Sequence, residues 1–333
     1  DEFVNVGTAN ATFIGMTNIV TEDIFYNYFD DYGFLKDEIK YKELIFKGNF
    51  TKLSYYIYLD RPIKITSQDA VLKDMAIIID SNNVTIDGLT IITKMELGDL
   101  ISVMDDNVTL KNMNLTYVVG DMAAYGINVH EAKNVNILDN VIYFESNITS
   151  DDKNTEAIYV EGSSDVVIDG NDITARLPGL NMEEFDYKYY GMGLAYVNGV
   201  KFYESKNVNF TDNRLDVTYN RLVASSYADI QALAVMGSEN VLIDNNVIVM
   251  NDTLDDEGII VCLVGIQFSG NDDVVVSNND ISIFSKGGQP IAGTAYPMSI
   301  IGTSMEIIGN NLSSEFNGLN IGIYMPYGMD PAR

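Results

Sequence analysis

The sequence predicts an all-β chain wound into a parallel β-helix, a solenoid of stacked coils. Three observations predict this fold: a short motif that recurs along the chain, three apolar columns within the aligned motif, and a polar turn between its strands. The motif is eleven residues long and first occurs at 81–91 as SNNVTIDGLTI. Its eight copies follow one another at intervals of 24 to 42 residues, and such recurrence indicates a stacked array. Because the motif is constant while the spacers vary, we expect constant rungs joined by loops of variable length.

The apolar columns of the motif indicate strands that bury one face. The first column holds valine seven times and methionine once, and the other two hold only Ile, Leu, Phe or Val. Mostly polar residues lie between them, which is the period-two pattern of a half-buried strand. All 24 positions are therefore expected to face one interior. The first column consists of Val84, Val108, Val135, Val166, Val208, Val241, Val274 and Met305.

A polar turn separates the second and third columns. Asparagine stands at one position of this turn in the last six copies, whereas Leu89 and Met113 occupy it in the first two. Identical Asn side chains stacked in register can form amide ladders, and Asn tolerates the left-handed backbone of a tight bend. A second column, mostly Asn or Asp, directly precedes the first apolar column. The predicted structural ladder consists of Asn140, Asn171, Asn213, Asn246, Asn279 and Asn310.

Residues 21–32 predict one convincing helix, which would cap the first coil. Thr21 can serve as its N-cap, acidic residues fill its first turn, and Gly33 would end it. Such an amphipathic helix would cover the apolar lumen and the free backbone edge of the first coil. The residues expected on its apolar face are Ile24, Phe25, Tyr28 and Phe29.

The repeats predict one elongated domain. We expect residues 1–60 to form the N-terminal cap and first strands, and residues 61–333 to form the coils. The segment 319–325, LNIGIYM, repeats the strand that precedes each motif, and PYGMDPAR then stops where the next anchor would fall. We therefore expect the last coil to be truncated and the native chain to continue into further domains.

Composition narrows the possible partners. The chain has 48 acidic and 20 basic residues, giving a formal net charge of −28. This charge argues against binding of nucleic acid, which needs clustered Lys and Arg, and against anionic membrane surfaces. It suits a surface in contact with cations or neutral sugars. We find no apolar stretch long enough to span a membrane, and a single cysteine allows no disulfide within the chain.

The motif N-V-x-I-x-x-N-x-I, preceded by a short strand such as GINV or AIYV, resembles the right-handed parallel β-helix repeat of pectin-degrading enzymes and many surface proteins. A narrower resemblance rests on TEDIFYNYFDDYG, ELIFKGNF, RPIKI and NNVTIDGLTI, which are similar to adhesin-like surface proteins of methanogenic archaea. That resemblance implies an extracellular, cell-surface rod that presents lateral loops to glycans or to surface proteins of neighbouring cells. Nine N-x-S/T sequons fit a glycoprotein, although Asn- and Thr-rich strands also produce sequons by chance.

The longest spacer, residues 175–198, is the leading candidate for ligand contact. It gathers aromatic and acidic residues, and aromatic rings stack on sugar faces while carboxylates accept hydrogen bonds from hydroxyl groups. The alternative is that these rings pack onto the coil and hold the loop down. The candidate ligand-binding residues are Phe185, Tyr187, Tyr189, Tyr190, Tyr196, Glu183, Glu184 and Asp186.

A second spacer raises the possibility of calcium. Asp255, Asp256 and Glu257 offer the hard oxygen ligands that calcium prefers. A solvated acidic loop explains the same residues, so we expect no metal or cofactor, with calcium as the alternative.

The sequence contains no recognisable catalytic motif. The pectin-hydrolase pattern would join paired carboxylates to Gly-His-Gly and Arg-Ile-Lys, and neither tripeptide occurs. The only histidine, His130, is expected at an exposed turn, because Glu161 takes the corresponding place one coil later. We therefore predict an adhesin-like protein that is not an enzyme and has no catalytic residues. A polysaccharide lyase or glycoside hydrolase of the pectinase-like group is the alternative, since glycosidases need only two suitably spaced carboxylates.

Overall fold

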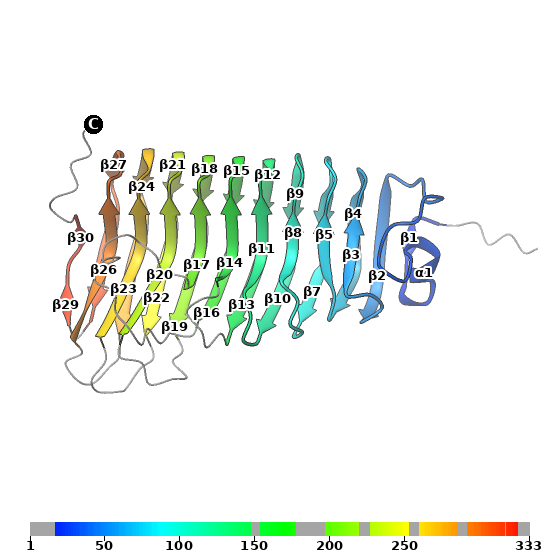
Figure 1. Cartoon of the computed structure of the whole chain (residues 1–333), viewed down its shortest axis with the longest axis horizontal. Helices are drawn as coiled ribbons and strands as arrows, with labels where there is room; N and C mark the ends of the chain where they lie inside the picture. Colours follow the sequence, from blue (N-terminus) through cyan, green and yellow to red (C-terminus); the bar gives the residue numbers. More distant parts are fainter. Residues whose placement is uncertain are drawn as a thin grey trace, which may run out of the picture.

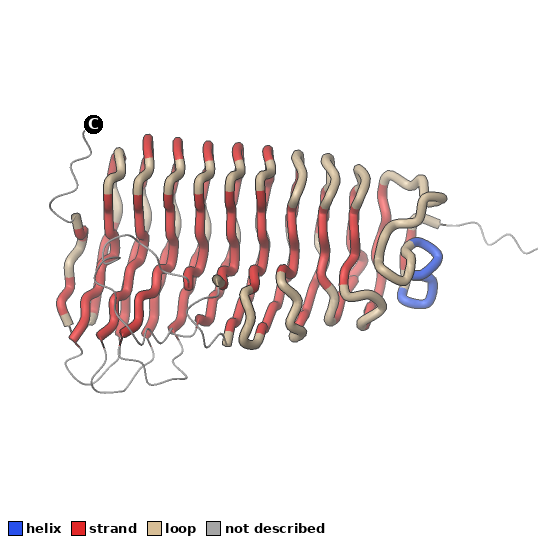
Figure 2. The backbone as a smooth tube through the Cα atoms, viewed as in Figure 1, coloured by secondary structure: helices blue, strands red, loops and turns tan. Residues whose placement is uncertain are grey.

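The computed structural model describes residues 17–147, 154–177, 197–219, 227–252, 260–285, 292–316 and 318–325. These residues form a right-handed parallel β-helix, an elongated rod of stacked coils (Figure 1). Its strands pair in parallel throughout an eleven-stranded and a nineteen-stranded sheet. The predicted fold class is confirmed, and among the described residues helix occurs only at the N-terminal end (Figure 2).

Each regular coil contributes three strands. The strand before the motif joins the eleven-stranded sheet, and the two strands within and after the motif form two columns of the nineteen-stranded sheet. The eleven-stranded sheet contains β3 (Tyr56–Leu59), β5 (Ala76–Ile79), β8 (Asp99–Val103), β11 (Ala124–His130), β14 (Thr155–Glu161), β17 (Val197–Tyr203), β20 (Tyr227–Met236), β23 (Ile260–Ser269), β26 (Ala292–Ile301), β29 (Leu319–Asn320) and β30 (Ile323–Tyr324).

The nineteen-stranded sheet holds the motif itself. Its anchor column contains β6 (Thr85–Asp87), β9 (Val108–Lys111), β12 (Lys133–Leu138), β15 (Ser164–Asp169), β18 (Lys206–Thr211), β21 (Glu239–Asp244), β24 (Asp272–Ser277) and β27 (Met305–Ile308). Its other column contains β7 (Thr90–Thr93), β10 (Asn114–Val119), β13 (Val141–Ser146), β16 (Asp172–Leu177), β19 (Arg214–Tyr219), β22 (Val247–Asp252), β25 (Asp280–Ser285) and β28 (Asn311–Glu315). Two long strands, β2 (Glu43–Thr51) and β4 (Lys64–Lys73), span both columns at the N-terminal end, where β1 (Ile19–Val20) pairs with β2.

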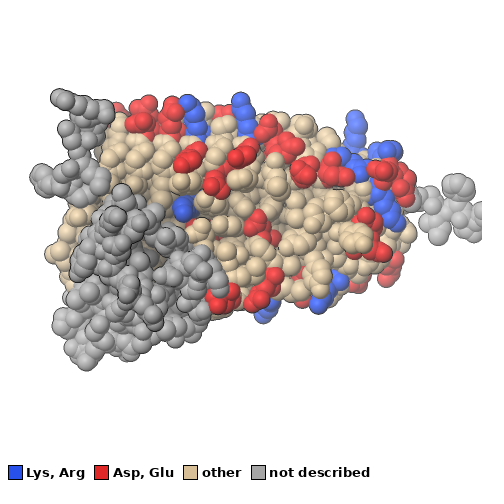
Figure 3. All heavy atoms as spheres, viewed as in Figure 1, with Lys and Arg blue, Asp and Glu red and all other residues tan. Residues whose placement is uncertain are grey.

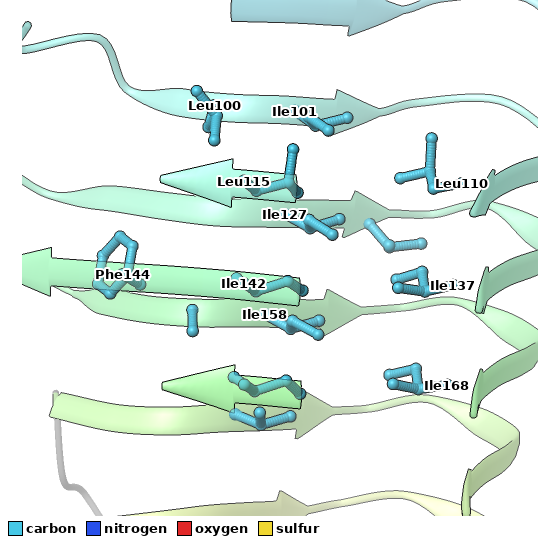
Figure 4. Close-up of a cluster of buried hydrophobic side chains, with 14 of the residues drawn as sticks. Leu100, Ile101, Leu110, Leu115, Ile127, Ile137, Ile142, Phe144, Ile158 and Ile168 are labelled. Atoms are coloured by element: carbon cyan, nitrogen blue, oxygen red, sulfur yellow. The ribbon is translucent and has the colours of Figure 1, made fainter. Parts of the chain in front are cut away.

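The register of the anchor column follows the sequence alignment. Val135 pairs with Val108 on one side and Val166 on the other, and the pairing continues through Val208 to Met305. The aligned apolar residues are buried in every copy but the last, where all three are half-buried. Figure 4 shows why they share one interior: Ile127 on β11, Ile142 on β13 and Ile137 on β12 point into the same lumen from three sides. Burial of this continuous apolar column is the main force that stabilises the stack.

The six asparagines form a hydrogen-bonded ladder along one corner. The Nδ2 of Asn140 donates to the Oδ1 of Asn171 at 2.9 Å, and the same contact joins each successive pair up to Asn310 at 2.9–3.2 Å. Each of these Oδ1 atoms also accepts the backbone N–H of the ladder asparagine on the preceding coil. The first of these amides accepts the backbone N–H of Met113 at 2.9 Å. Leu89 and Met113 continue the column as buried apolar residues.

The left-handed backbone at this corner belongs to the residue before the ladder. Asp139 has φ 53° and Gly170 has φ 68°, whereas the ladder asparagines have negative φ. The column before the anchor is also left-handed, as at Asn107 and Asn134 with φ 57°. The middle coils have a third left-handed residue after the strand that precedes the motif, such as Glu131 with φ 50° and Gly162 with φ 57°. Left-handed residues therefore make the bends of each coil, and the ladder amides serve to satisfy buried backbone groups rather than to relieve strain.

The N-terminal cap packs its predicted apolar face on the first coil, but its helix is shorter than expected. A 3₁₀ turn, η1 (Glu22–Ile24), leads into a single α-helical turn, α1 (Phe25–Tyr28), and no side chain caps either start. Phe29 already has extended backbone and pairs with Leu35, which ends the helix before the predicted residue 32. Phe25 and Phe29 are buried against Phe50 and Phe46 of β2, with ring centroids 6.2 and 6.0 Å apart. The cap therefore covers the end of the lumen with three aromatic rings, the third being Tyr28.

Candidate functional site

The candidate ligand-contact residues lie outside the described residues. This holds for Phe185, Tyr187, Tyr189, Tyr190, Tyr196, Glu183, Glu184 and Asp186, and also for Asp255, Asp256 and Glu257. Their proposed roles remain predictions. The structure instead reveals a second group of polar and aromatic side chains, on the outer face of the eleven-stranded sheet.

Two rows that point away from the lumen cross strands β8, β11, β14 and β17, and of their residues Tyr159 is 7% exposed while Glu156 and Asn198 are fully buried. In one row Asp99, Tyr125, Glu156 and Asn198 pair coil by coil. In the other row Ser102, Asn128, Tyr159 and Lys201 do the same. Gly126, Ala157 and Gly199 lie between the rows, and a Cβ at Gly126 would come within 2.4 Å of the Ala157 carbonyl oxygen. Small residues are therefore required where the strands bend, and the bend brings the two rows together on one surface, named here the sheet-face site.

A stacked tyrosine pair lies at the centre of the sheet-face site. The rings of Tyr125 and Tyr159 lie 5.0 Å apart at an interplanar angle of 15°. The Lys201 ammonium lies 5.5 Å from the centroid of the Tyr159 ring and 5.8 Å from that of Tyr203, within the range of cation–π attraction. Burial raises the pKa of both hydroxyl groups of the stacked pair above the usual value for tyrosine, so both remain neutral hydrogen-bond donors at neutral pH.

Glu156 is a fully buried carboxyl group on the same face. Its Oε1 accepts a hydrogen bond from the Nδ2 of Asn198 at 3.0 Å, while its Oε2 has no hydrogen-bond partner. Burial raises the pKa of this carboxyl to about 7, against the opposing effects of the Lys201 charge and the Asn198 hydrogen bond. A carboxyl tuned to this range can both give and take a proton near neutral pH, which is a property of functional sites.

A second carboxyl, Asp99, lies on the other side of Tyr125. Its Oδ2 accepts hydrogen bonds from the Nδ2 of Asn128 at 3.0 Å and from the hydroxyl of Ser102. Burial raises the pKa of Asp99 above its usual range, and the two hydrogen bonds oppose this shift. Two coil steps separate Asp99 from Glu156, which places their backbones about 10 Å apart.

The single histidine lies at the edge of the site. His130 is exposed and pairs in register with Glu161, as the sequence alignment predicts. The Nδ1 of His130 lies 3.2 Å from the Oε2 of Glu161. Exposed pairs of this kind contribute little to stability.

The sequence contained a signal for this site that the motif alignment did not use. Aligning the strands before the motif places Tyr125, Glu156 and Asn198 in one column, with a small residue directly after each. A column of polar residues that is followed at each coil by a small residue marks a row that points away from the lumen. The aromatic loop gives the stronger signal in the sequence, because its residues are contiguous.

The charges around the site are mixed. On the face viewed in Figure 3, acidic side chains are scattered among uncharged ones and gather along the edges, with basic side chains interspersed. Within the described ranges, no group of three or more His, Cys, Asp or Glu residues is placed to hold a metal ion. No described helix has the length and apolar character needed to cross a membrane.

No protein-family model matches the sequence, and no curated protein matches it. Solved structures with a similar fold include the A-module of an Azotobacter vinelandii mannuronan C-5 epimerase, at 12% identity and a TM-score of 0.36, covering 84% of this chain and 91% of that chain. PfbA, a surface adhesin of Streptococcus pneumoniae, is 12% identical with a TM-score of 0.46 over 83% of each chain. A mannuronic acid specific polysaccharide family 6 lyase from human gut microbiota is 10% identical with a TM-score of 0.39 over 87% of this chain and 81% of that chain. Likenesses at this level concern the fold alone.

These structures correct the expectation that the chain is not an enzyme. Two of the three are enzymes by name, an epimerase and a lyase, so the fold is shared by enzymes and adhesins alike. The missing Gly-His-Gly and Arg-Ile-Lys tripeptides exclude only the pectin-hydrolase pattern. The prediction was wrong because it treated the absence of one catalytic pattern as the absence of catalysis.

Proposed function

We propose that this chain is an extracellular, adhesin-like surface protein whose sheet-face site binds glycans. The observation that carries the proposal is the half-buried ring of Tyr125, which stacks on the buried ring of Tyr159. Asp99, Asn128 and Lys201 lie around this pair. The faces of aromatic rings carry partial negative charge, which attracts the C–H groups on the apolar face of a sugar ring. The surrounding carboxylate, amide and ammonium groups supply acceptors and donors for hydroxyl groups.

The rod form supports display at a cell surface. Stacked coils that each add about 4.8 Å make a stiff spacer, and the resemblance of the N-terminal segment to adhesin-like proteins of methanogenic archaea motivates the same assignment. The partners that we propose are glycans or surface proteins of neighbouring cells. The candidate loop at 175–198 is retained as a second contact in this proposal, and calcium as a possible addition.

A binding experiment tests this function. The chain is titrated with neutral oligosaccharides from a glycan array, and Tyr125→Ala is compared with the unchanged chain. Loss of one aromatic contact should weaken binding about threefold to tenfold. Tyr143→Ala is the matched control, because Tyr143 is a half-buried tyrosine on a different sheet face, on β13. Absence of glycan binding, or equal loss in both variants, would refute the sheet-face site as a glycan-binding surface.

Glu156 favours a second candidate function, an enzyme that acts on a polysaccharide. Its raised pKa of about 7 suits a general acid or base. Asp99 is a second carboxyl on the same face, and inverting glycosidases place their two carboxyl groups about 6.5–9.5 Å apart. The chain is incubated with neutral and uronate polymers, and new reducing ends and unsaturated products are measured. Activity that disappears in a folded Glu156→Gln variant supports this candidate, whereas no turnover of any polymer by the folded chain removes it.

A further inference from the structure

A pocket of about 440 Å³ lies beside the cap, at the first strand of the eleven-stranded sheet. Its volume falls within the range of small-molecule sites, about 300–1,000 Å³. Tyr32 is 77% exposed and Tyr55 is 53% exposed, so ring surface is accessible to a ligand. Five aromatic residues line the pocket: Tyr32, Phe34, Tyr55, Tyr56 and Tyr58.

The walls of this pocket are held in place by the fold. The Oδ1 of Asp30 accepts the backbone N–H groups of Tyr32 and Phe34, both at 2.9 Å. The Phe34 ring stacks on Tyr58 of β3 with centroids 4.2 Å apart and an interplanar angle of 7°. The backbone N–H of Tyr58 donates to the carbonyl oxygen of Gly33 at 2.9 Å. A preorganised site of this kind loses little conformational entropy on binding.

The chemistry of the pocket suits a neutral sugar. Its two charged lining residues, Asp31 and Lys52, have opposite signs, so the pocket favours neither an anion nor a cation. Ring faces offer contact to an apolar surface, and the tyrosine hydroxyl groups, Asp31 and Lys52 offer hydrogen bonds. A pyranose ring presents both kinds of surface.

The pocket and the sheet-face site lie on the same face of the eleven-stranded sheet. Tyr58, Ile78, Ser102, Asn128 and Tyr159 follow one another in register on β3, β5, β8, β11 and β14. Four coil steps separate Tyr58 from Tyr159, or about 19 Å along the axis. Figure 1 shows these five strands side by side along the rod. Burial and the neighbouring Tyr58 raise the pKa of Tyr56 in the pocket, and the charge of Asp99 in the sheet-face site raises it further.

We propose that the pocket is a second saccharide subsite, which holds one end of a neutral oligosaccharide whose body lies on Tyr125, the more exposed ring of the stacked pair. The ligand is then an extended chain that runs along the rod axis, not a single terminal sugar. This inference rests on the proposed glycan-binding function and adds the class and direction of the ligand.

A length series tests the subsite. Cello-, manno- and xylo-oligosaccharides from disaccharide to octasaccharide are titrated calorimetrically against the full chain, Tyr55→Ala, Tyr32→Ala, Tyr125→Ala and the control Tyr143→Ala. Removal of Tyr55 or Tyr32 should weaken octasaccharide binding about threefold to tenfold. Disaccharide bound at the sheet-face site should be unaffected by those two changes, while Tyr125→Ala should weaken both lengths.

The outcomes separate the two proposals. If octasaccharide binding depends on Tyr125 but not on Tyr55 or Tyr32, the pocket is not a subsite and the sheet-face site stands. If no oligosaccharide binds, both proposals fail. A proline-rich decapeptide is titrated in parallel, because aromatic grooves also take such peptides. Peptide binding that depends on Tyr55, without any effect of Tyr55 on sugars, would overturn the saccharide assignment.

Discussion

The Oε1 of Glu156 accepts a hydrogen bond from the Nδ2 of Asn198 on the next coil at 3.0 Å, and Oε2 of the same fully buried carboxyl has no hydrogen-bond partner. An ionised carboxylate with one empty acceptor in a buried site is costly. This is why the pKa of Glu156 rises to about 7.

The raised pKa predicts a pH dependence of stability. The folded-state pKa of about 7 lies above the solvated value of 4.5. The folded chain therefore binds the proton more tightly, and the contribution to stability is fully present below pH 4.5 and lost as pH rises through 7. Relative to Glu156→Gln, the free energy of unfolding should fall by about 3 kcal/mol across this window.

Urea unfolding of both chains between these pH values measures the effect. Glu306→Gln, at an exposed position on β27, should leave the pH dependence of the original chain unchanged. If the free energies of unfolding of Glu156→Gln and of the original chain differ by the same amount at all pH values, Glu156 does not titrate in this range.

The asparagine ladder predicts a large cost for a single deletion in its middle. Asn213→Ala leaves the backbone N–H of Asn171 without the Oδ1 that accepts it at 2.9 Å, and the carbonyl oxygen of Ile168 without the Nδ2 that donates to it at 2.8 Å. Both groups are buried, and each unsatisfied donor or acceptor costs about 1–3 kcal/mol. The free energy of unfolding, measured in urea, should fall by about 2–5 kcal/mol. The exposed Asn114→Ala should change it by less than about 0.5 kcal/mol, and an equal effect of both changes would contradict a structural role for the ladder.

Replacement of Gly33 by alanine should destabilise the turn next to the pocket. The φ of Gly33 is +89°, and an added Cβ would lie 1.8 Å from the carbonyl oxygen of Tyr56. Gly48 has φ +88° with open space around it, so Gly48→Ala imposes the same backbone strain without a clash. Thermal unfolding should show Gly33→Ala at least about 2 kcal/mol less stable than Gly48→Ala. Equal stabilities would mean that the turn at residue 33 does not pack against β3 as described.

Removal of one aromatic ring from the N-terminal cap should lower the free energy of unfolding. Phe29 is fully buried, with its ring 4.7 Å from Phe25 and 6.0 Å from Phe46. Phe29→Ala should lower the free energy of unfolding by about 3–5 kcal/mol in a denaturant titration. Tyr32→Ala, whose side chain is 77% exposed, should change it little. A small effect of Phe29→Ala would indicate that the cap contributes nothing to the first coil.

The expectations that held were those based on local, repeated chemistry. The valine column from Val108 to Val274 pairs in the register that the motif alignment implies. The helix limits were wrong, because Phe29 leaves helical backbone and pairs with Leu35 across the turn that follows. The left-handed residue of the ladder turn was also misplaced by one position, since sequence preference does not separate Asp139 from Asn140.

The sequence by itself determined the stacked coils, their buried columns and the polar corners, because each copy of the motif repeats the same hydrophobic alternation and the same turn residues. Only the tertiary structure decided which outward residues meet. Glu156 and Asn198 are 42 residues apart and come into contact because the spacer between them adds length without changing the register of β14 and β17. Their burial and the pKa that follows depend on that three-dimensional neighbourhood, which no single copy of the motif encodes.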